Sequence, residues 1–270
     1  MVKARILTMY IFCLGLWLLL PGPAQLLAAG KEMTPPEEHL LASAYPAGEV
    51  LHYDVTWLGL TAGRLTMAVK QLDDRGELLA LEITARTAGL LGKIYPVRDT
   101  FRVVVRSPAR LPSHYRIDEH QGERRNIRTT IYNQERRLIV YQRNQDPVER
   151  FTVAGPVHNE FSAFYAMRIM PLALGKGVVI PTFADRERHD VEVLVEKIES
   201  IDSILGRRES LQVRPQLTFV GLYEKAGDPQ IWLTDDQYRV PLRVRSRIAI
   251  GSLTATLTYY QGPAGEFPSP

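Results

Sequence analysis

Cysteine is almost absent from this 270-residue chain, in which Cys13 is the only one and lies in an apolar run near the N-terminus. Without a second cysteine, no intrachain disulfide can hold the fold, although disulfides are common in exported proteins. The core must therefore be stabilised by burial of apolar side chains alone. A chain of this length can bury about 70% of its unfolded surface, so that is feasible.

An excess of charge of one sign is also lacking. The chain has 33 Lys and Arg against 30 Asp and Glu, which gives a formal net charge of +3. Without residues 1–29, which contain Lys3 and Arg5, the balance is 33 − 2 = 31 against 30, or +1. This balance gives no reason to expect nucleic acid or an anionic membrane surface as a partner.

The N-terminal segment has the layout of an export signal. Lys3 and Arg5 precede the 15-residue apolar run Ile6–Leu20, and the small residues Ala28 and Ala29 follow. This pattern predicts a signal peptide at residues 1–29. An uncleaved anchor helix is the alternative, but the run is short for a span of ~20 residues. We therefore expect a periplasmic protein with no transmembrane segment after signal cleavage.

Long helical patterns are scarce, and alternation of apolar and polar residues replaces them. In Gly48–Trp57, every second side chain is large and apolar, and turn signals recur every ~10 residues up to residue 260. The sequence predicts an all-β, mainly antiparallel fold, a curved sheet or barrel-like meander. We expect one β domain at 45–262, a flexible tether at 30–44 and a disordered tail at 263–270.

One segment, NEFSAFYAMRIMPLAL at residues 159–174, has helical spacing instead. Asn159 can cap the helix, and Pro171 ends it near residue 170. Four side chains share one helical face at i, i+3, i+4 and i+7, namely Phe161, Phe164, Tyr165 and Arg168. A single aromatic helix among strands is expected to pack against the concave side of the sheet.

Four blocks of sequence resemble the DUF3108 family of exported bacterial proteins. They are GEVLHY at 48–53 with Trp57 and Ala62-Gly63, IYPVRD at 94–99, FSAFYAMR at 161–168, and IWLTDD at 231–236 with Arg239-Val240-Pro241. The one departure is Asn159, where an aspartate is expected before the helix. The resemblance implies a mostly antiparallel, curved or barrel-like β structure in the cell envelope, and it implies no established activity.

Arg168 is the most suggestive candidate residue. On a helical face inside a curved sheet its guanidinium needs a partner, because an unpaired buried charge is very costly. Asp54, Asp99 or Asp235 would serve in a structural ion pair, and the acidic head group of a ligand would serve in a binding site.

Large aromatic side chains are the other candidates for ligand contact. Aromatic rings stack on sugars and acyl chains, but they also commonly form the core of β domains. With Arg168, the candidate ligand-binding residues are Tyr165, Phe164, Trp57, Tyr53, Trp232 and Asp235.

Patterns for catalysis and metal binding are missing. No G-x-S-x-G is present, and Ser162 lies in a predicted helix rather than a nucleophile elbow. His114 and His120 are six residues apart, ~20 Å along a strand, too far to share one ion. We therefore expect no catalytic residues, no metal and no cofactor.

These observations favour a non-enzymatic binding or carrier module for an amphipathic envelope component, a lipid or lipid-linked glycan. Two alternatives stay open. One is a structural or scaffold protein with an envelope protein partner, and the other is an envelope glycan hydrolase with two opposed carboxylates.

Overall fold

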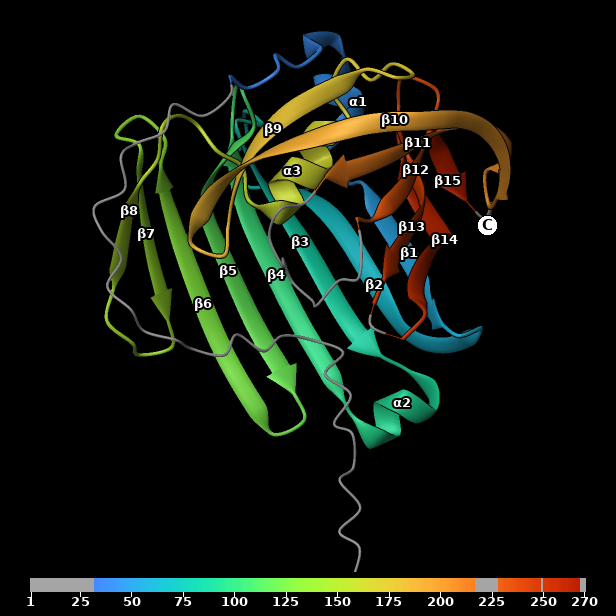
Figure 1. Cartoon of the computed structure of the whole chain (residues 1–270), viewed down its shortest axis with the longest axis horizontal. Helices are drawn as coiled ribbons and strands as arrows, with labels where there is room; N and C mark the ends of the chain where they lie inside the picture. Colours follow the sequence, from blue (N-terminus) through green and yellow to red (C-terminus); the bar gives the residue numbers. More distant parts are fainter. Residues whose placement is uncertain (1–31, 217–227, 249, 268–270) are drawn as a thin grey trace, which may run out of the picture.

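The computed structural model describes residues 32–216, 228–248 and 250–267. The predicted signal peptide and Cys13 lie outside these residues. Fifteen strands form one sheet (Figure 1). They are β1 Val50–Trp57, β2 Leu60–Gln71, β3 Leu78–Thr87, β4 Val97–Arg106, β5 Leu111–Gln121, β6 Arg124–Asn133, β7 Leu138–Arg143, β8 Glu149–Thr152, β9 Gly177–Ala184, β10 Glu187–Ser203, β11 Gly206–Gln216, β12 Gln230–Thr234, β13 Pro241–Arg247, β14 Ser252–Gly262 and β15 Gly265–Phe267.

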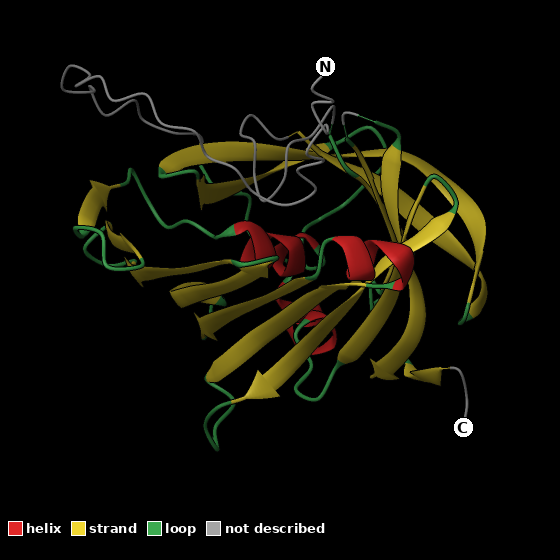
Figure 2. Ribbon diagram, turned by 90° about the horizontal axis from the view of Figure 1, so that it is seen from below, coloured by secondary structure: helices red, strands yellow, loops and turns green. Residues whose placement is uncertain are grey.

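The sheet consists of two antiparallel meanders joined edge to edge. Its order is β8-β7-β6-β5-β4-β3-β2-β1-β14-β13-β12-β11-β10-β9, with β15 added beside β14. The first and last strands of this path, β8 and β9, do not pair with each other, so the sheet curves strongly without closing (Figures 1 and 2). The predicted all-β class, mainly antiparallel and barrel-like, is confirmed.

A helix, α3 at Glu160–Met167, connects the two meanders and lies within the curve of the sheet (Figure 2). The Phe161 ring packs on Phe101 of β4, with 4.9 Å between ring centroids, and meets Tyr115 of β5 edge-on. Because strand side chains alternate, the face with Phe101 and Tyr115 is the concave one, and their sequence neighbours point to the convex side.

The helix is shorter than predicted, and its buried face differs. Regular α-helix ends at Met167, and single turns carry the chain to Met170. Tyr165 and Arg168 are fully buried as expected, whereas Phe161 and Phe164 are only half-buried. Both phenylalanines still pack against the core, but the buried positions of the helix also include Ser162, Ala166 and Met167.

The segment predicted to be a flexible tether is part of the fold. It forms the helical turns η1 Glu38–Leu40 and α1 Leu41–Ala44, and Leu40 and Ala44 are buried in the core. Backbone N–H groups of Thr34 and Glu37 donate to the Val179 and Ile169 carbonyls. The apolar residues Leu40, Leu41 and Ala44, which follow the prolines and glutamates of this segment, explain why it packs.

Two further elements differ from the sequence-based expectation. Residues 265–267, predicted to belong to a disordered tail, form β15 and extend the pairing of β14. A short helix, α2 at Gly89–Ile94, lies between β3 and β4 at one end of the sheet (Figure 1).

Asn159 caps α3 as predicted, and this contact can be tested. Its side-chain oxygen accepts from the Ser162 N–H, and Ser162 Oγ accepts from the Asn159 N–H in return. Replacing Asn159 by Ala should reduce the free energy of unfolding by about 1 kcal/mol, measured by urea denaturation. Asn159→Asp keeps an acceptor oxygen at the positive helix end and should retain most of the stability. Equal losses in both variants would contradict the capping role.

Candidate functional site

The centre of the molecule contains a buried ion pair between Arg168 and Glu49. Arg168 follows the last turn of α3, and Glu49 directly precedes β1. Two parallel hydrogen bonds join them, Nη1 to Oε2 at 2.7 Å and Nη2 to Oε1 at 2.8 Å, and both side chains are 0% exposed. Burial acts to lower the pKa of Arg168, but the charge and hydrogen bonds of Glu49 raise it above its usual value. The guanidinium is therefore permanently charged.

The three aspartates predicted as partners of Arg168 are not its partners. Asp54 lies near Arg64, with 3.6 Å between Oδ1 and Nε, and Asp235 is exposed. Asp99 accepts hydrogen bonds from His120 and Gln121 of the neighbouring strand β5 instead. Glu49 reaches Arg168 because the chain enters β1 directly beside the end of α3.

The turn between β12 and β13 completes the surroundings of Arg168. Its Nε donates to the Arg239 carbonyl at 3.1 Å, and Nη2 also donates to the Tyr238 carbonyl at 3.0 Å. Asp236 shapes this turn, because its Oδ1 accepts from Thr234 Oγ1 and from two backbone N–H groups. Asp235 belongs to the same turn, where its backbone N–H donates to the Glu209 carbonyl and its exposed carboxylate interacts electrostatically with Arg239.

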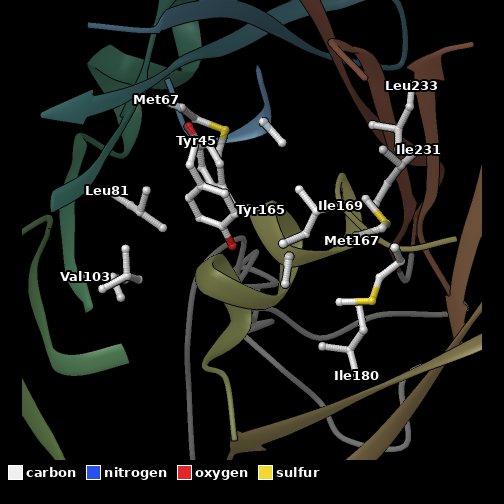
Figure 3. Close-up of a cluster of buried hydrophobic side chains, with 14 of the residues drawn as sticks. Tyr45, Met67, Leu81, Val103, Tyr165, Met167, Ile169, Ile180, Ile231 and Leu233 are labelled. Carbon is white, nitrogen blue, oxygen red and sulfur yellow. The ribbon is translucent and has the colours of Figure 1, made fainter. Parts of the chain in front are cut away.

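Three of the predicted aromatic residues gather around the ion pair. The Tyr165 ring lies 5.4 Å from Arg168 Cζ, and Phe164 meets Tyr165 edge-on. The Tyr53 hydroxyl donates to the Pro241 carbonyl at 2.8 Å. Figure 3 shows Tyr165 beside Tyr45 and Met67, between side chains of the two meanders. The structure thus brings Tyr53, Phe164 and Tyr165 together with Arg168.

The two tryptophans lie elsewhere. The neighbours of Trp232 on β12, Ile231 and Leu233, belong to the hydrophobic core, and Trp232 points to the opposite face. There its Nε1 donates to Glu199 at 2.8 Å, and Arg243 covers the ring. Trp57 lies at the end of β1, where its Nε1 donates to the Ile250 carbonyl. A single aromatic surface containing all the candidates does not form.

Asp99, named from the sequence only as a possible partner of Arg168, belongs to a set of polar side chains on the concave face of β4, β5 and β6 that the sequence did not predict. Asp99 and Glu119 are directly opposite each other on β4 and β5, and both are buried. Glu119 pairs with Arg128 of β6, and Asp99 accepts from the His120 N–H and from Gln121 Nε2 at 2.9 Å. We call Asp99, Glu119, Gln121 and Arg128 the concave polar group.

Burial raises the pKa of two carboxyl groups, Asp99 in the concave polar group and Glu160 in α3. It raises the pKa of Asp99 to about 6, although the hydrogen bonds from Gln121 and His120 oppose the shift. It raises the pKa of Glu160, the first residue of α3, to about 7. The nearby Tyr115 hydroxyl is buried and has no hydrogen-bond partner among the described residues, and neither has that of Tyr165.

The alternation of the strands could have revealed Asp99 and Glu119 as candidate site residues. Asp99 occupies an inward position in the series Val97, Phe101, Val103 and Val105, and Glu119 follows Tyr115 and Ile117 in the same way. A charged residue at an inward position of a strand is unusual enough to indicate a site. Glu49 has no such periodic signal, because it precedes its strand.

The described residues contain neither a metal-binding cluster nor a membrane-spanning helix. No group of three or more His, Cys, Asp or Glu side chains there is placed to hold a metal ion. No helix in residues 32–216, 228–248 and 250–267 has the length and apolar character needed to cross a bilayer.

The fold and its central ion pair define an open, barrel-like β-sheet protein with an enclosed helix. A solved structure with this architecture is the "Beta-barrel-like Protein of Domain of Unknown Function DUF1849" from Brucella abortus. It is 9% identical over 80% of this chain and 98% of its own, with a TM-score of 0.55. The family model "Protein of unknown function (DUF3108)" matches residues 52–258, and the chain belongs to this family.

Two other comparisons add little. The hypothetical protein CT021 from Chlamydia trachomatis aligns over 88% of this chain and 98% of its own at 9% identity, but the TM-score is only 0.37. That value is too low to support a conclusion. No curated protein matches the chain significantly.

The Glu49–Arg168 pair predicts a large loss of stability when one partner is removed. Arg168→Leu leaves the Glu49 carboxylate buried without its cation, so the free energy of unfolding should fall by about 3–5 kcal/mol. The double variant Glu49→Leu/Arg168→Met removes both charges and should be more stable than Arg168→Leu. Guanidinium denaturation measures both effects, and a loss below about 1 kcal/mol in Arg168→Leu would contradict this role.

The raised pKa of Glu160 predicts a pH-dependent stability. The unfolded carboxyl titrates near its ordinary value of 4.5, and the folded one near 7. Between these values the folded protein holds the proton more strongly, so this contribution to stability is full below pH 4.5 and is lost as the pH rises through 7. Urea denaturation across this range should show the loss in the natural protein and a smaller one in Glu160→Gln. Glu135→Gln, at an exposed hairpin position, is the control and should follow the natural protein.

Proposed function

We propose that this protein is an exported, periplasmic binding or carrier module for an amphipathic envelope component, and that it acts without catalysis. The component is a lipid or a lipid-linked glycan. The signal-like residues 1–29 support the location. The observation that carries the proposal is the change of chemistry along the concave face of β4 and β5.

That face is apolar near α3 and polar farther along the strands. The opposed pairs Val103 with Tyr115 and Phe101 with Ile117 are apolar or aromatic, and the next inward pair is Asp99 with Glu119. An amphipathic molecule likewise has an apolar part followed by a polar end. Binding sites of this kind combine an apolar lining with a few placed polar groups.

The concave polar group, rather than Arg168, is the proposed contact for the polar end of the ligand. Glu49 and two carbonyls already occupy the guanidinium of Arg168. Carboxylates accept hydrogen bonds and repel anions, so Asp99 and Glu119 favour a polar end that donates. Sugar hydroxyls and ammonium groups meet this requirement.

Buried hydroxyls without protein partners also support a bound molecule. Buried polar atoms in folded proteins nearly always have a hydrogen-bond partner. The hydroxyls of Tyr115 and Tyr165 have none among the described residues. Tyr115 lies opposite Val103 in the apolar part of the concave face, where a ligand oxygen or a water would pair with its hydroxyl.

A glycan hydrolase is the second candidate, on the basis of the raised pKa values of Asp99 and Glu160. Carboxyl groups that keep a proton near neutral pH are suited to acid catalysis. Both oxygens of Asp99, however, accept hydrogen bonds from neighbouring residues, and Asp99 and Glu119 lie side by side on one face. This arrangement favours binding over the opposed pair that hydrolysis needs.

Native mass spectrometry of protein purified gently from an expressing periplasm tests the proposal. The expected result is an adduct that organic extraction releases as a lipid or glycolipid. A chain that stays free of adduct after incubation with envelope extract would contradict binding. Release of shortened glycan products by the pure protein would support the hydrolase instead.

Two variants of adjacent residues on β5 provide a matched comparison. Glu119→Gln alters the concave polar group, and Asp118→Asn makes the same chemical change on the convex face. We expect Glu119→Gln to lower the fraction of protein carrying the adduct roughly tenfold, as for loss of one charged hydrogen bond, and Asp118→Asn to leave it unchanged. Equal occupancy in both variants would place the ligand elsewhere, provided that thermal unfolding shows both to be folded.

A further inference from the structure

Four arginines and a histidine lie directly opposite one another across five neighbouring strands. Pairing places Arg64 of β2 opposite Arg86 of β3, and Arg86 opposite Arg98 of β4. Arg98 is in turn opposite His120 of β5, and His120 is opposite Arg125 of β6. We call these five residues the arginine row. They lie on the convex face, since their neighbours Asp99 and Glu119 face inward.

The convex face around the arginine row has a strong excess of positive charge. On β2 to β6 it carries eight exposed cations and two acids, so the local balance is 8 − 2 = +6. The net charge of the whole chain without residues 1–29 is only +1, so positive charge is concentrated on this face. The cations are Arg64, Lys70, Arg86, Arg98, Arg102, Arg106, Arg116 and Arg125, and the acids are Glu82 and Asp118.

Three of the five members of the arginine row have no acidic partner among the described residues. Arg64 has Asp54 at 3.6 Å, and His120 has Asp118 at 3.0 Å. No described acidic side chain lies within ion-pair distance of Arg86, Arg98 or Arg125. Like charges directly opposite each other destabilise a sheet, and nothing in the packing requires arginine at exposed positions. An anionic partner outside the chain would remove this repulsion.

Exposed apolar side chains lie at the same end of the sheet as the arginine row. Leu58 and Leu60 in the β1–β2 turn are 63% and 72% exposed, and Ile94 at the end of α2 is 71% exposed. Ile250 in the β13–β14 turn is 50% exposed, and its carbonyl accepts from Trp57 next to Leu58. The Ala88 N–H donates to the Ala62 carbonyl, which ties the start of α2 to β2.

Figure 1 shows α2 and the β1–β2 turn at the same lower end of the curved sheet. Arg86 and Arg98 flank α2 in the sequence, and Arg64 is four residues from Leu60. The row of cations and the projecting apolar residues therefore form one continuous end of the molecule. Further exposed cations at this end are Lys93, Arg124, Arg245 and Arg247.

We propose that this end of the convex face docks on the surface of an anionic phospholipid bilayer. Basic side chains are attracted to anionic head groups, and apolar residues that project beside them enter the boundary between head groups and acyl chains. An acidic protein would satisfy the arginines, but it gives no reason for four exposed Leu and Ile side chains spread over three separate connections between strands. The combination is what favours a membrane surface.

Vesicle flotation of the protein purified from the periplasm tests the proposal. We expect binding to vesicles of 30% phosphatidylglycerol in phosphatidylcholine at low salt, and weak binding to pure phosphatidylcholine. Binding should decrease at high salt, because ions screen exposed charges. The charge reversal Arg86→Glu/Arg98→Glu should lower the partition coefficient roughly tenfold or more.

Arg207→Glu/Arg208→Glu is the matched control, with the same change of charge at the exposed start of β11. It should bind as the natural protein does. Leu60→Ser/Ile94→Ser should reduce the binding that survives high salt. All variants share the same N-terminus, so residues 1–29, if they were retained, would not produce a difference between them.

Three outcomes would overturn the proposal. One is no flotation with phosphatidylglycerol vesicles, and another is an equal loss in the two charge-reversal variants. The third is binding to soluble polyglutamate as tight as to vesicles with no effect of Leu60→Ser/Ile94→Ser, which would indicate an acidic protein partner. None of these outcomes bears on ligand retention in native mass spectrometry, so the two proposals can fail separately.

Discussion

The structure depends on one buried ion pair, Glu49 with Arg168, which joins three segments far apart in the sequence. Glu49 begins the first meander, Arg168 ends the helix between the meanders, and the carbonyls of Tyr238 and Arg239 belong to the second. An open sheet lacks the closing strand pairs that lock a barrel. A buried charge pair, with an acceptor for each guanidinium nitrogen, holds the two halves and the helix in one arrangement, since any shift would leave a charge buried alone.

This use of Arg168 gives a physical reason for three of the four sequence blocks that resemble the family. The G-E pair supplies the carboxylate, and the T-D-D turn directs two carbonyls at the guanidinium. The helix block supplies the arginine and Ser162, which completes the capping box with Asn159. These blocks therefore describe how the fold is held together. Of the concave polar group, only Asp99 belongs to one of the four blocks.

The two proposed surfaces lie on opposite faces of the same strand ends. Arg98 and Asp99 are adjacent on β4, and Glu119 and His120 are adjacent on β5, so one member of each pair faces outward and the other inward. A module that receives an amphipathic molecule from a bilayer would need its polar binding group close to the docked surface. The alternation of a β-strand provides that proximity directly.

Much of this architecture could be predicted from the sequence alone. Alternation in segments such as 48–57 determines strands, the turn spacing determines antiparallel pairing, and Asn159 determines where the helix begins, because each of these is a local property of the backbone. The partner of Arg168 was not predictable, since Glu49 lies 119 residues away and no local pattern connects them. The arginine row was hidden for a similar reason. Its members are scattered over 62 positions, and the nearly neutral net charge conceals them until pairing between strands brings them side by side.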